Sequence, residues 1–324
     1  MTDKLDKTIN EINKVYGNCT IGRLKDMPTI ETERVSTGSP YLDWCVSGGW
    51  PLGRSVELYG NPSNGKSLLA LRTIVEFQKL GKKVVYLDSE QGFDPRFAKI
   101  IGVDIDNLII SQISGGEDVF DIIDKLLDTE VALIVVDSVA SLLPQYEEEN
   151  PMEKQTIGLH AKLLSKGLRK ITGKASKNKT LILFINQIRQ KPTNYGNPNI
   201  VTGGLALGFY ASIRVEVTRG ELIEENKKVI GQQIKFRVTK SKVCQPFRDG
   251  YFIFYHPDLE SKDKQVVFDD ADELVSMLLI QGKIIRRGPI YDILGQSFKG
   301  REELENEIRN NKEFKEKLIK LNSK

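Results

Sequence analysis

Residues 60–67 read GNPSNGKS, and this stretch matches the G-x-x-x-x-G-K-[ST] pattern of a phosphate-binding loop. The apolar run SVELYG before it is typical of a short strand, and LLALRTIVEFQKL after it has the apolar spacing of a helix. Gly60 and Gly65 allow a tight turn in which successive backbone N–H groups point at a polyphosphate. The positive end of the following helix dipole adds to this anion site. The residues expected to bind a nucleotide here are Gly60, Asn61, Pro62, Ser63, Asn64, Gly65, Lys66 and Ser67.

Strand-like and helix-like patterns alternate after the loop. Residues 82–88, 131–137 and 180–186 are apolar, β-branched runs of the kind found in buried parallel strands. Residues 118–127 and 158–175 have helical spacing. This rhythm predicts an α/β fold with a doubly wound, mainly parallel sheet. SIRVEVTR, QQIKFRVTKSK and GYFIFYH then follow without intervening helices, so we expect an antiparallel extension of the sheet.

The pattern divides the chain into three expected parts. Residues 1–34 hold an amphipathic helix whose apolar stripe needs a partner, either this chain's core or a neighbouring subunit, and we expect them to be an oligomerisation segment. Residues 35–257 form the core that carries the phosphate-binding loop, with two long loops at 144–158 and 188–204. Residues 269–324 form a small α-rich C-terminal domain, after a polar, linker-like stretch.

Composition and targeting signals argue against several classes of protein. The chain has 324 residues, 40% of them hydrophobic, and no apolar run near the roughly 18–20 residues that span a bilayer. Its polar N-terminus lacks the apolar region of a secretory signal, so we expect a cytoplasmic protein without a membrane partner. The three cysteines and two histidines are scattered, which argues against a zinc site or a Ser-His-Asp triad.

The distribution of charge is unusual although the net charge is only +3. Residues 154–215 contain no Asp or Glu. One interpretation is a surface that binds a polyanion, most simply nucleic acid. The other is a solvated basic helix that balances acid elsewhere, such as Glu147, Glu148 and Glu149. The basic residues of this stretch are Lys154, Lys162, Lys166, Arg169, Lys170, Lys174, Lys177, Lys179, Arg189, Lys191 and Arg214.

Polar residues at the ends of the predicted strands complete a candidate site, since ligands of a parallel sheet bind there. Lys66 would neutralise the β- and γ-phosphates, and Ser67 would hold magnesium together with Asp137, which closes VALIVVD. Glu90 would polarise the water that attacks the γ-phosphate, although a surface or helix-capping Glu fits its spacing equally well. Gln187 closes TLILFIN and would report the γ-phosphate to the loop that follows.

The chain resembles the bacterial RecA recombinases along nearly its whole length. The resemblance implies a RecA-type P-loop NTPase core flanked by an N-terminal helix and a small C-terminal domain. The segments that carry it are STGSPYLD, ELYGNPSNGKS, YLDSEQGFDPRFAKIIGVDIDNLIISQ, LIVVDSVASLLP, FINQIR, YGNPNIVTGG, GFYASIRVEV and VTKSKVCQPF.

This resemblance assigns roles around the nucleotide. Glu90 matches the catalytic carboxylate and Gln187 the nucleotide-sensing amide. Asp94 and Phe97 match residues around the adenine, and Tyr255 is expected nearby.

The same resemblance assigns the subunit and DNA contacts. Lys240 and Lys242 match lysines that reach ATP across the subunit boundary, in the manner of arginine fingers. Phe209 matches an aromatic residue that anchors one subunit to the next. The segments around residues 157–158 and 195–204 match the first and second DNA-binding loops. The positions expected to contact DNA are Ile157, Gly158, Ser165, Arg169, Arg189, Lys191, Tyr195, Gly203 and Gly204.

Some positions depart from the family pattern. Ile157 replaces the usual Met and Tyr195 the usual Phe, and both keep a bulky side chain that can wedge between bases. Gly208 replaces a Lys before the anchoring Phe209, which removes one interface charge. The C-terminal stretch is basic where many relatives are acidic, so autoinhibition by an acidic tail is not expected.

The resemblance implies an ATP- and Mg²⁺-dependent homologous recombination protein. Such a protein polymerises as a helical homo-oligomeric filament on single-stranded DNA, pairs it with double-stranded DNA and exchanges strands, with DNA-dependent ATP hydrolysis. Its setting would be DNA repair, DNA damage and the SOS response, with a single-strand-binding protein and loader proteins as accessory partners. The alternatives are a ring-shaped helicase or motor on the same core, and a non-catalytic paralogue that regulates a recombinase.

Overall fold

The computed structural model describes residues 4–17, 20–23, 26, 32–150, 158–190, 199–259 and 267–322. The chain divides into two compact units, Met1–Glu33 and Arg34–Lys324. The first unit holds the expected amphipathic helix, α1 (Lys4–Tyr16), which has no buried residue within its own unit. The side-chain amide of Asn13 is hydrogen-bonded to both backbone groups of Ile21, which folds the following chain back on the helix.

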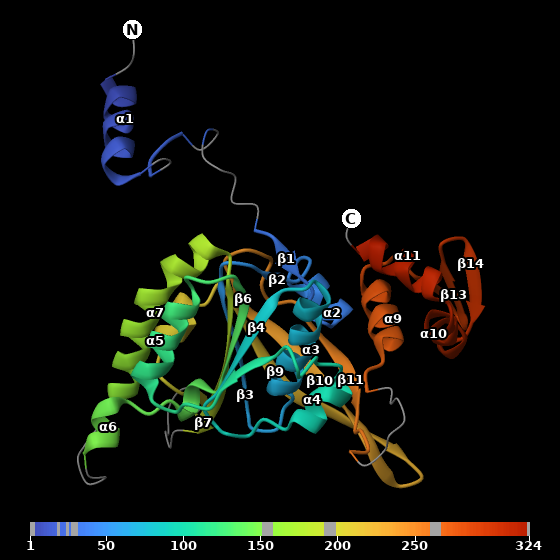
Figure 1. Ribbon diagram of the computed structural model, residues 1–324. Helices are drawn as coiled ribbons and strands as arrows, with labels where there is room; N and C mark the ends of the chain where they lie inside the picture. The colour runs from blue at the N-terminus through green and yellow to red at the C-terminus, as the bar shows by residue number, and fades with distance from the viewer. Residues whose placement is uncertain are drawn as a thin grey trace. The chain divides into compact units, whose positions relative to one another are not determined.

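The second unit is built on a nine-stranded sheet of order β11-β10-β9-β3-β7-β6-β4-β5, with β8 paired to β7 (Figure 1). The pairs from β9 through β5 are parallel, whereas β10, β11 and β8 are antiparallel to their neighbours. The prediction of a mainly parallel sheet with an antiparallel extension is therefore confirmed. The strands are β3 (Ser55–Gly60), β4 (Lys83–Asp88), β5 (Ile109–Ser111), β6 (Val131–Asp137), β7 (Leu181–Gln190), β8 (Asn199–Val201), β9 (Ile213–Glu225), β10 (Lys228–Ser241) and β11 (Asp249–Tyr255).

Helices cover both faces of this sheet. Side chains alternate across a strand, so Leu133 and Val135 of β6 enter one apolar cluster while Ile134 and Val136 enter another. The first cluster includes α3 (Lys66–Lys79) and α4 (Pro95–Ile101), and the second includes α5 (Gly116–Leu126) and α7 (Leu159–Asn178). Figure 1 shows the two pairs of helices on opposite sides of the strands. The continuous apolar runs seen in the sequence are thus explained by burial on both faces.

The close approach of α5 and α7 involves a glycine on each helix. A Cβ at Gly167 of α7 would lie 2.4 Å from a ring carbon of Phe120, and one at Gly116 of α5 would lie 2.2 Å from Cδ2 of Leu163. Short elements fill the connections: β1 (Arg34–Val35), α2 (Pro40–Cys45), β2 (Trp50–Pro51), the 3₁₀ helix η2 (Val139–Ser141), α6 (Gln145–Glu149) and α8 (Ala206–Tyr210).

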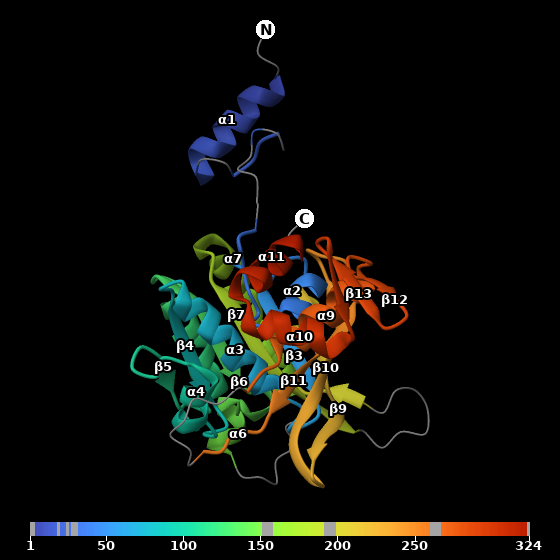
Figure 2. The same cartoon turned by 90° about the vertical axis from the view of Figure 1, so that its right-hand side faces the viewer.

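The C-terminal segment packs on the same unit, and its core residues continue the first apolar cluster. It contains α9 (Asp270–Ile280), β12 (Ile285–Arg287), β13 (Ile290–Ile293), β14 (Gln296–Lys299), α10 (Arg301–Asn310) and α11 (Lys312–Asn322). Figure 2 shows these helices gathered beside α2 and above β11. The three-stranded sheet β12–β14 was not foreseen from the sequence. No helix in the described ranges is long and apolar enough to cross a membrane.

Candidate nucleotide and DNA site

The phosphate-binding loop connects β3 to α3 and lies against the antiparallel part of the sheet. A Cβ at Gly60 would lie 2.1 Å from the carbonyl oxygen of Val217, and one at Gly65 would lie 2.5 Å from Cδ1 of Ile234. Gly65 also has φ = 90°, a conformation that favours glycine. Asn64 donates from Nδ2 to the carbonyl of Val217 at 3.2 Å. Close packing against the backbone therefore requires glycine at position 60, and the positive φ favours glycine at position 65.

Lys66 is buried at the start of α3. Its ammonium group donates to the backbone carbonyls of Gly60, at 3.1 Å, and Asn61, at 2.7 Å. Burial lowers the pKa of Lys66, and nearby Asp137 and Glu90 oppose that shift. Since an ammonium group has three donors and two are used by the loop, one remains for a phosphate.

The carboxylate of Asp137 lies beside Ser67, the last residue of the loop. The hydroxyls of Ser67 and Tyr86 both donate to its Oδ2 atom, each at 2.6 Å. Burial raises the pKa of Asp137, and the carboxylates of Glu90 and Asp88 add to the shift. A hydroxyl and a carboxylate oxygen in contact are suited to a hard divalent cation such as Mg²⁺. The peptide bond between Asp137 and Ser138 is cis.

Glu90 and Gln187 lie side by side at the carboxyl edge of the sheet. Gln187 donates from Nε2 to Glu90 Oε1 at 2.6 Å, and the Ser138 hydroxyl donates to the same oxygen. The backbone N–H of Ser89 donates to the Asp137 carbonyl at 2.8 Å, which ties the end of β4 to the end of β6. The structure thus brings together the strand-end residues that the sequence singled out.

The residues expected around the adenine are only partly together. Asp94 caps α4 by accepting from Arg96 N at 2.8 Å, and the Phe97 ring packs edge-on against Phe254, with centroids 6.1 Å apart. Tyr255 instead lines a cavity with Phe268 beside α9 and α10. In the part of the chain that the structure describes, no ring contact joins Tyr255 to Phe97. Phe254, which the sequence did not single out, is the aromatic neighbour of Phe97.

Lys240 and Lys242 lie at the end of β10, beside α8. Lys240 donates from Nζ to the carbonyls of Gly208, at 2.5 Å, and Phe209, at 2.9 Å; Lys242 donates to Phe209 at 3.0 Å. Burial lowers the pKa of Lys240, and the charges of Lys242 and Arg214 add to the shift. The Phe209 side chain is 68% exposed. The expected interface aromatic and the two expected cross-subunit lysines therefore form one surface.

The two expected DNA loops meet on the first turns of α7. Gly158 begins that helix, and a Cβ at Gly203 would lie 2.1 Å from Leu164 Cδ1. Ser165, Arg169 and Arg189 are exposed. Three of the expected DNA contacts, Ile157, Lys191 and Tyr195, lie outside the described residues.

The basic helix α7 is partly neutralised by acidic residues of α5 and of the turn that follows it. Lys170 pairs with Asp121 of α5 at 2.9 Å, and Lys174 pairs with Asp124 of α5 at 3.1 Å and with Asp128, just after α5, at 2.7 Å. The balancing acid for these two lysines thus comes from α5 and the residues directly after it. The expected polyanion surface is consequently smaller than the sequence stretch suggests.

Two buried carboxylates near the site, Asp88 and Glu57, were not predicted from the sequence. Asp88 is 2% exposed and accepts from the backbone N–H groups of Gly92 and Phe93, both at 3.1 Å, which shapes the loop after Glu90. Glu57 is fully buried and accepts from Asn186 Nδ2 at 2.9 Å and from Arg214 Nε at 2.5 Å. A charged residue inside the apolar strand SVELYG was the available signal for Glu57.

The family model and the similar proteins found by comparison all carry the name RecA. The family model of the RecA N-terminal domain matches residues 3–258. "Protein RecA" of Mesomycoplasma hyopneumoniae strain J is 45% identical over 247 residues, which cover 75% of this chain and 73% of that protein. "Protein RecA" of Rhodospirillum centenum is 40% identical and covers 95% of this chain and 85% of that protein. "Protein RecA" of Thermosynechococcus vestitus is 38% identical and covers 97% of this chain and 87% of that protein.

The region matched by the family model includes the residues of the candidate site. The phosphate loop, the strand-end carboxylates and the paired amide all lie in the matched region. The chain therefore belongs to the RecA family of recombinases.

Proposed function

We propose that this recombinase is a DNA-dependent ATPase that forms helical filaments on single-stranded DNA in the cytoplasm and exchanges strands with homologous double-stranded DNA. The observation that carries the proposal is the hydrogen-bonded group at the carboxyl edge of the sheet. In it, Ser67 contacts Asp137, and Gln187 contacts Glu90. A nucleotide-hydrolysing site needs these two halves, one for the phosphates and one for the attacking water.

The residues present fit ATP and magnesium. The loop offers backbone N–H groups and the unused donor of Lys66, and both favour a polyphosphate. The adjacent oxygens of Ser67 and Asp137 fit the preference of Mg²⁺ for oxygen ligands. When bound, the ion would neutralise charge on the transferred phosphate.

Glu90 is suited to the role of general base. Its Oε1 atom is held by Gln187 and Ser138, which fixes the side chain. No hydrogen bond to its Oε2 atom is present among the described residues, so that atom can accept a proton from water.

The second DNA loop is connected to this base through the backbone. Thr202 donates from its N–H and its hydroxyl to the Gln187 carbonyl, each at 3.1 Å. Asn186 donates from Nδ2 to the Thr202 carbonyl at 3.1 Å. DNA bound at this loop would therefore shift Gln187 and with it Glu90, which links hydrolysis to DNA binding.

We assign Lys240 and Lys242 to the ATP site of a neighbouring subunit. Within their own chain they contact the end of α8 next to exposed Phe209. This position suits a subunit junction, where they would stabilise charge on the transferred phosphate.

The test is a strand-exchange assay with homologous and heterologous duplexes, with and without ATP. Exchange that requires both homology and ATP supports the proposal. Electron microscopy of the DNA complex is the companion measurement, because closed rings without helical filaments would instead indicate a motor.

A further inference from the structure

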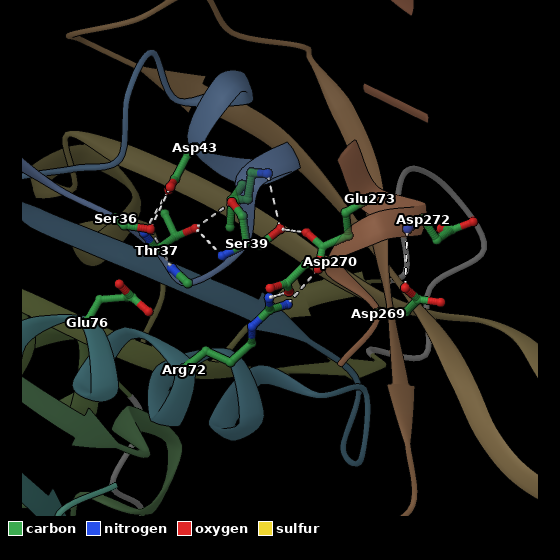
Figure 3. Close-up of polar contacts among 12 residues, drawn as sticks. Ser36, Thr37, Ser39, Asp43, Arg72, Glu76, Asp269, Asp270, Asp272 and Glu273 are labelled. Atoms are coloured by element: carbon green, nitrogen blue, oxygen red, sulfur yellow. Dashed lines mark hydrogen bonds and ion pairs between the residues drawn. The ribbon is translucent and has the colours of Figure 1, made fainter. Parts of the chain in front are cut away.

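Among the described residues, most buried polar side-chain atoms are hydrogen-bonded, and an exception can mark a functional group. Arg72 of α3 follows the rule: it donates from Nη1 to Glu273 at 2.9 Å and from Nη2 to Asp270 at 3.0 Å (Figure 3). His160 is an exception, because in the described part of the chain its Nδ1 atom is buried and has no hydrogen-bond partner. The hydrolysis site described above does not use this ring.

The other ring nitrogen of His160 contacts the turn that follows β6. His160 is the second residue of α7, and its Nε2 atom lies 2.9 Å from the Val139 carbonyl oxygen. Since a carbonyl only accepts hydrogen bonds, Nε2 carries a proton and donates it. Burial lowers the pKa of His160, so the ring is neutral at pH 7 and its Nδ1 atom is an acceptor.

The bond to Val139 connects this ring to the proposed general base. Val139 is fully buried and begins η2, two residues after Asp137. The residue between them, Ser138, donates from its hydroxyl to Oε1 of Glu90. A movement of His160 is therefore passed through one turn of backbone to a group that holds Glu90.

The Nδ1–Cε1 edge of the ring faces the expected second DNA loop. A Cβ at Gly203 would lie 3.0 Å from Nδ1 of His160, 3.1 Å from its Cε1 atom and 2.1 Å from Cδ1 of Leu164. His160 and Leu164 are four positions apart, so they are neighbours on one face of α7. The backbone of Gly203 thus packs between these two side chains, next to Thr202, which is bonded to the Gln187 carbonyl.

We propose that His160 is a positioning residue that couples the second DNA loop to Glu90. Its Nε2 atom holds the turn after Asp137, and its Nδ1 atom accepts a backbone N–H of residues 203–204 when DNA is bound at the loop. The two groups that donate to Glu90 Oε1 would then both be connected to that loop. Gln187 is connected to it through Thr202, and Ser138 is connected to it through Val139 and His160. This inference rests on the proposed function, because it adds a second connection between DNA binding and hydrolysis.

Two substitutions separate the roles of the two nitrogen atoms. His160→Gln places an amide N–H where Nε2 lies, so it keeps the donor to Val139 and removes the Nδ1 acceptor. His160→Asn places an amide oxygen where Nδ1 lies, so it keeps that acceptor and removes the donor. Each variant is thus the matched control for the other.

Steady-state ATPase rates with and without single-stranded DNA measure the coupling. In His160→Gln we expect the ratio of the two rates to fall about fivefold, the effect of one lost hydrogen bond, while the rate and the KM for ATP without DNA stay unchanged. In His160→Asn the rate without DNA should fall as well, because the turn after Asp137 loses its donor in either state. A ratio in His160→Gln equal to that of the wild type would overturn the inference, as would an equal loss of its two rates, which would indicate a structural role alone.

Solid-state NMR of sedimented protein labelled with ¹⁵N-histidine observes the ring directly. The chain has two histidines, so each spectrum contains two rings, and exposed His256 is the internal reference. We expect His160 to be protonated at Nε2 in all samples. When an oligonucleotide and a slowly hydrolysed ATP analogue are added, the Nδ1 signal of His160 should move toward that of a hydrogen-bonded acceptor, with His256 unchanged.

A ring protonated at Nδ1 would overturn the inference, and so would an Nδ1 signal that bound DNA leaves unchanged. These spectra do not depend on turnover. A wild type whose ATPase rate does not rise with DNA would therefore overturn the proposed function, while the spectra would still decide whether the loop engages His160.

Discussion

Arg169→Ala should weaken binding to single-stranded DNA of every sequence and make that binding less sensitive to salt. Arg169 is exposed on α7, and among the described residues it forms no ion pair with a carboxylate. Lys170 and Lys174 on the same helix are instead paired with acidic residues of α5 and of the turn after it. A DNA phosphate can therefore be neutralised by Arg169 directly, whereas the two lysines are already engaged.

The magnitude follows from counterion release. Each phosphate neutralised on single-stranded DNA contributes about −0.7 to the slope of log affinity against log salt. Loss of one contact should thus flatten the slope by about 0.7, which over a roughly fourfold rise in salt reduces the loss of affinity by about 2.5-fold.

Fluorescence anisotropy of labelled oligonucleotides, at several salt concentrations and with a slowly hydrolysed ATP analogue, measures the slope. The matched control is the double variant Lys174→Gln with Asp128→Asn, which removes an ion pair of the same helix without changing the net charge. We expect its slope to equal that of the wild type. An unchanged slope in Arg169→Ala would refute the reasoning, as would an equal flattening in the control. Either result would make α7 a solvated basic face.

Local patterns predicted which residues lie together at the carboxyl edge of the sheet. The phosphate loop, the buried strands and the polar residues at their ends each depend on a few consecutive residues. Asp137 and Gln187 come together because their parallel strands, β6 and β7, are neighbours that end at the same edge of the sheet. That much of the geometry follows from the alternation of strands and helices alone.

Contacts between distant segments could not be predicted in the same way. Lys174 of α7 and Asp124 of α5 are 50 positions apart, so their ion pair depends on how the two helices pack. The contact between the rings of Phe97 and Phe254 likewise joins α4 to β11, which are far apart in the sequence. The strands β12–β14 have three or four residues each, too few to show an alternating pattern.

Three further changes test the site and its support. Glu90→Gln should retain ATP and DNA binding yet lose most turnover, since it removes the proton acceptor and leaves the phosphate loop intact; wild-type turnover in a steady-state ATPase assay would contradict the assignment. Lys240→Ala with Lys242→Ala should bind nucleotide but hydrolyse it poorly, and mixing with Glu90→Gln should partly restore turnover, because mixed junctions pair an intact Glu90 with intact lysines; absence of rescue at every mixing ratio would argue against action between subunits. Arg214→Met should lower the free energy of unfolding by about 3–5 kcal/mol in urea titrations, because it leaves the Glu57 carboxylate buried without its cation. The double variant Arg214→Met with Glu57→Gln should recover much of that loss, since the uncompensated charge is then gone. A double variant no more stable than the single one would show that the loss comes from packing of Arg214 on Tyr59, where the guanidinium carbon lies 4.6 Å from the ring centroid, and not from the buried charge.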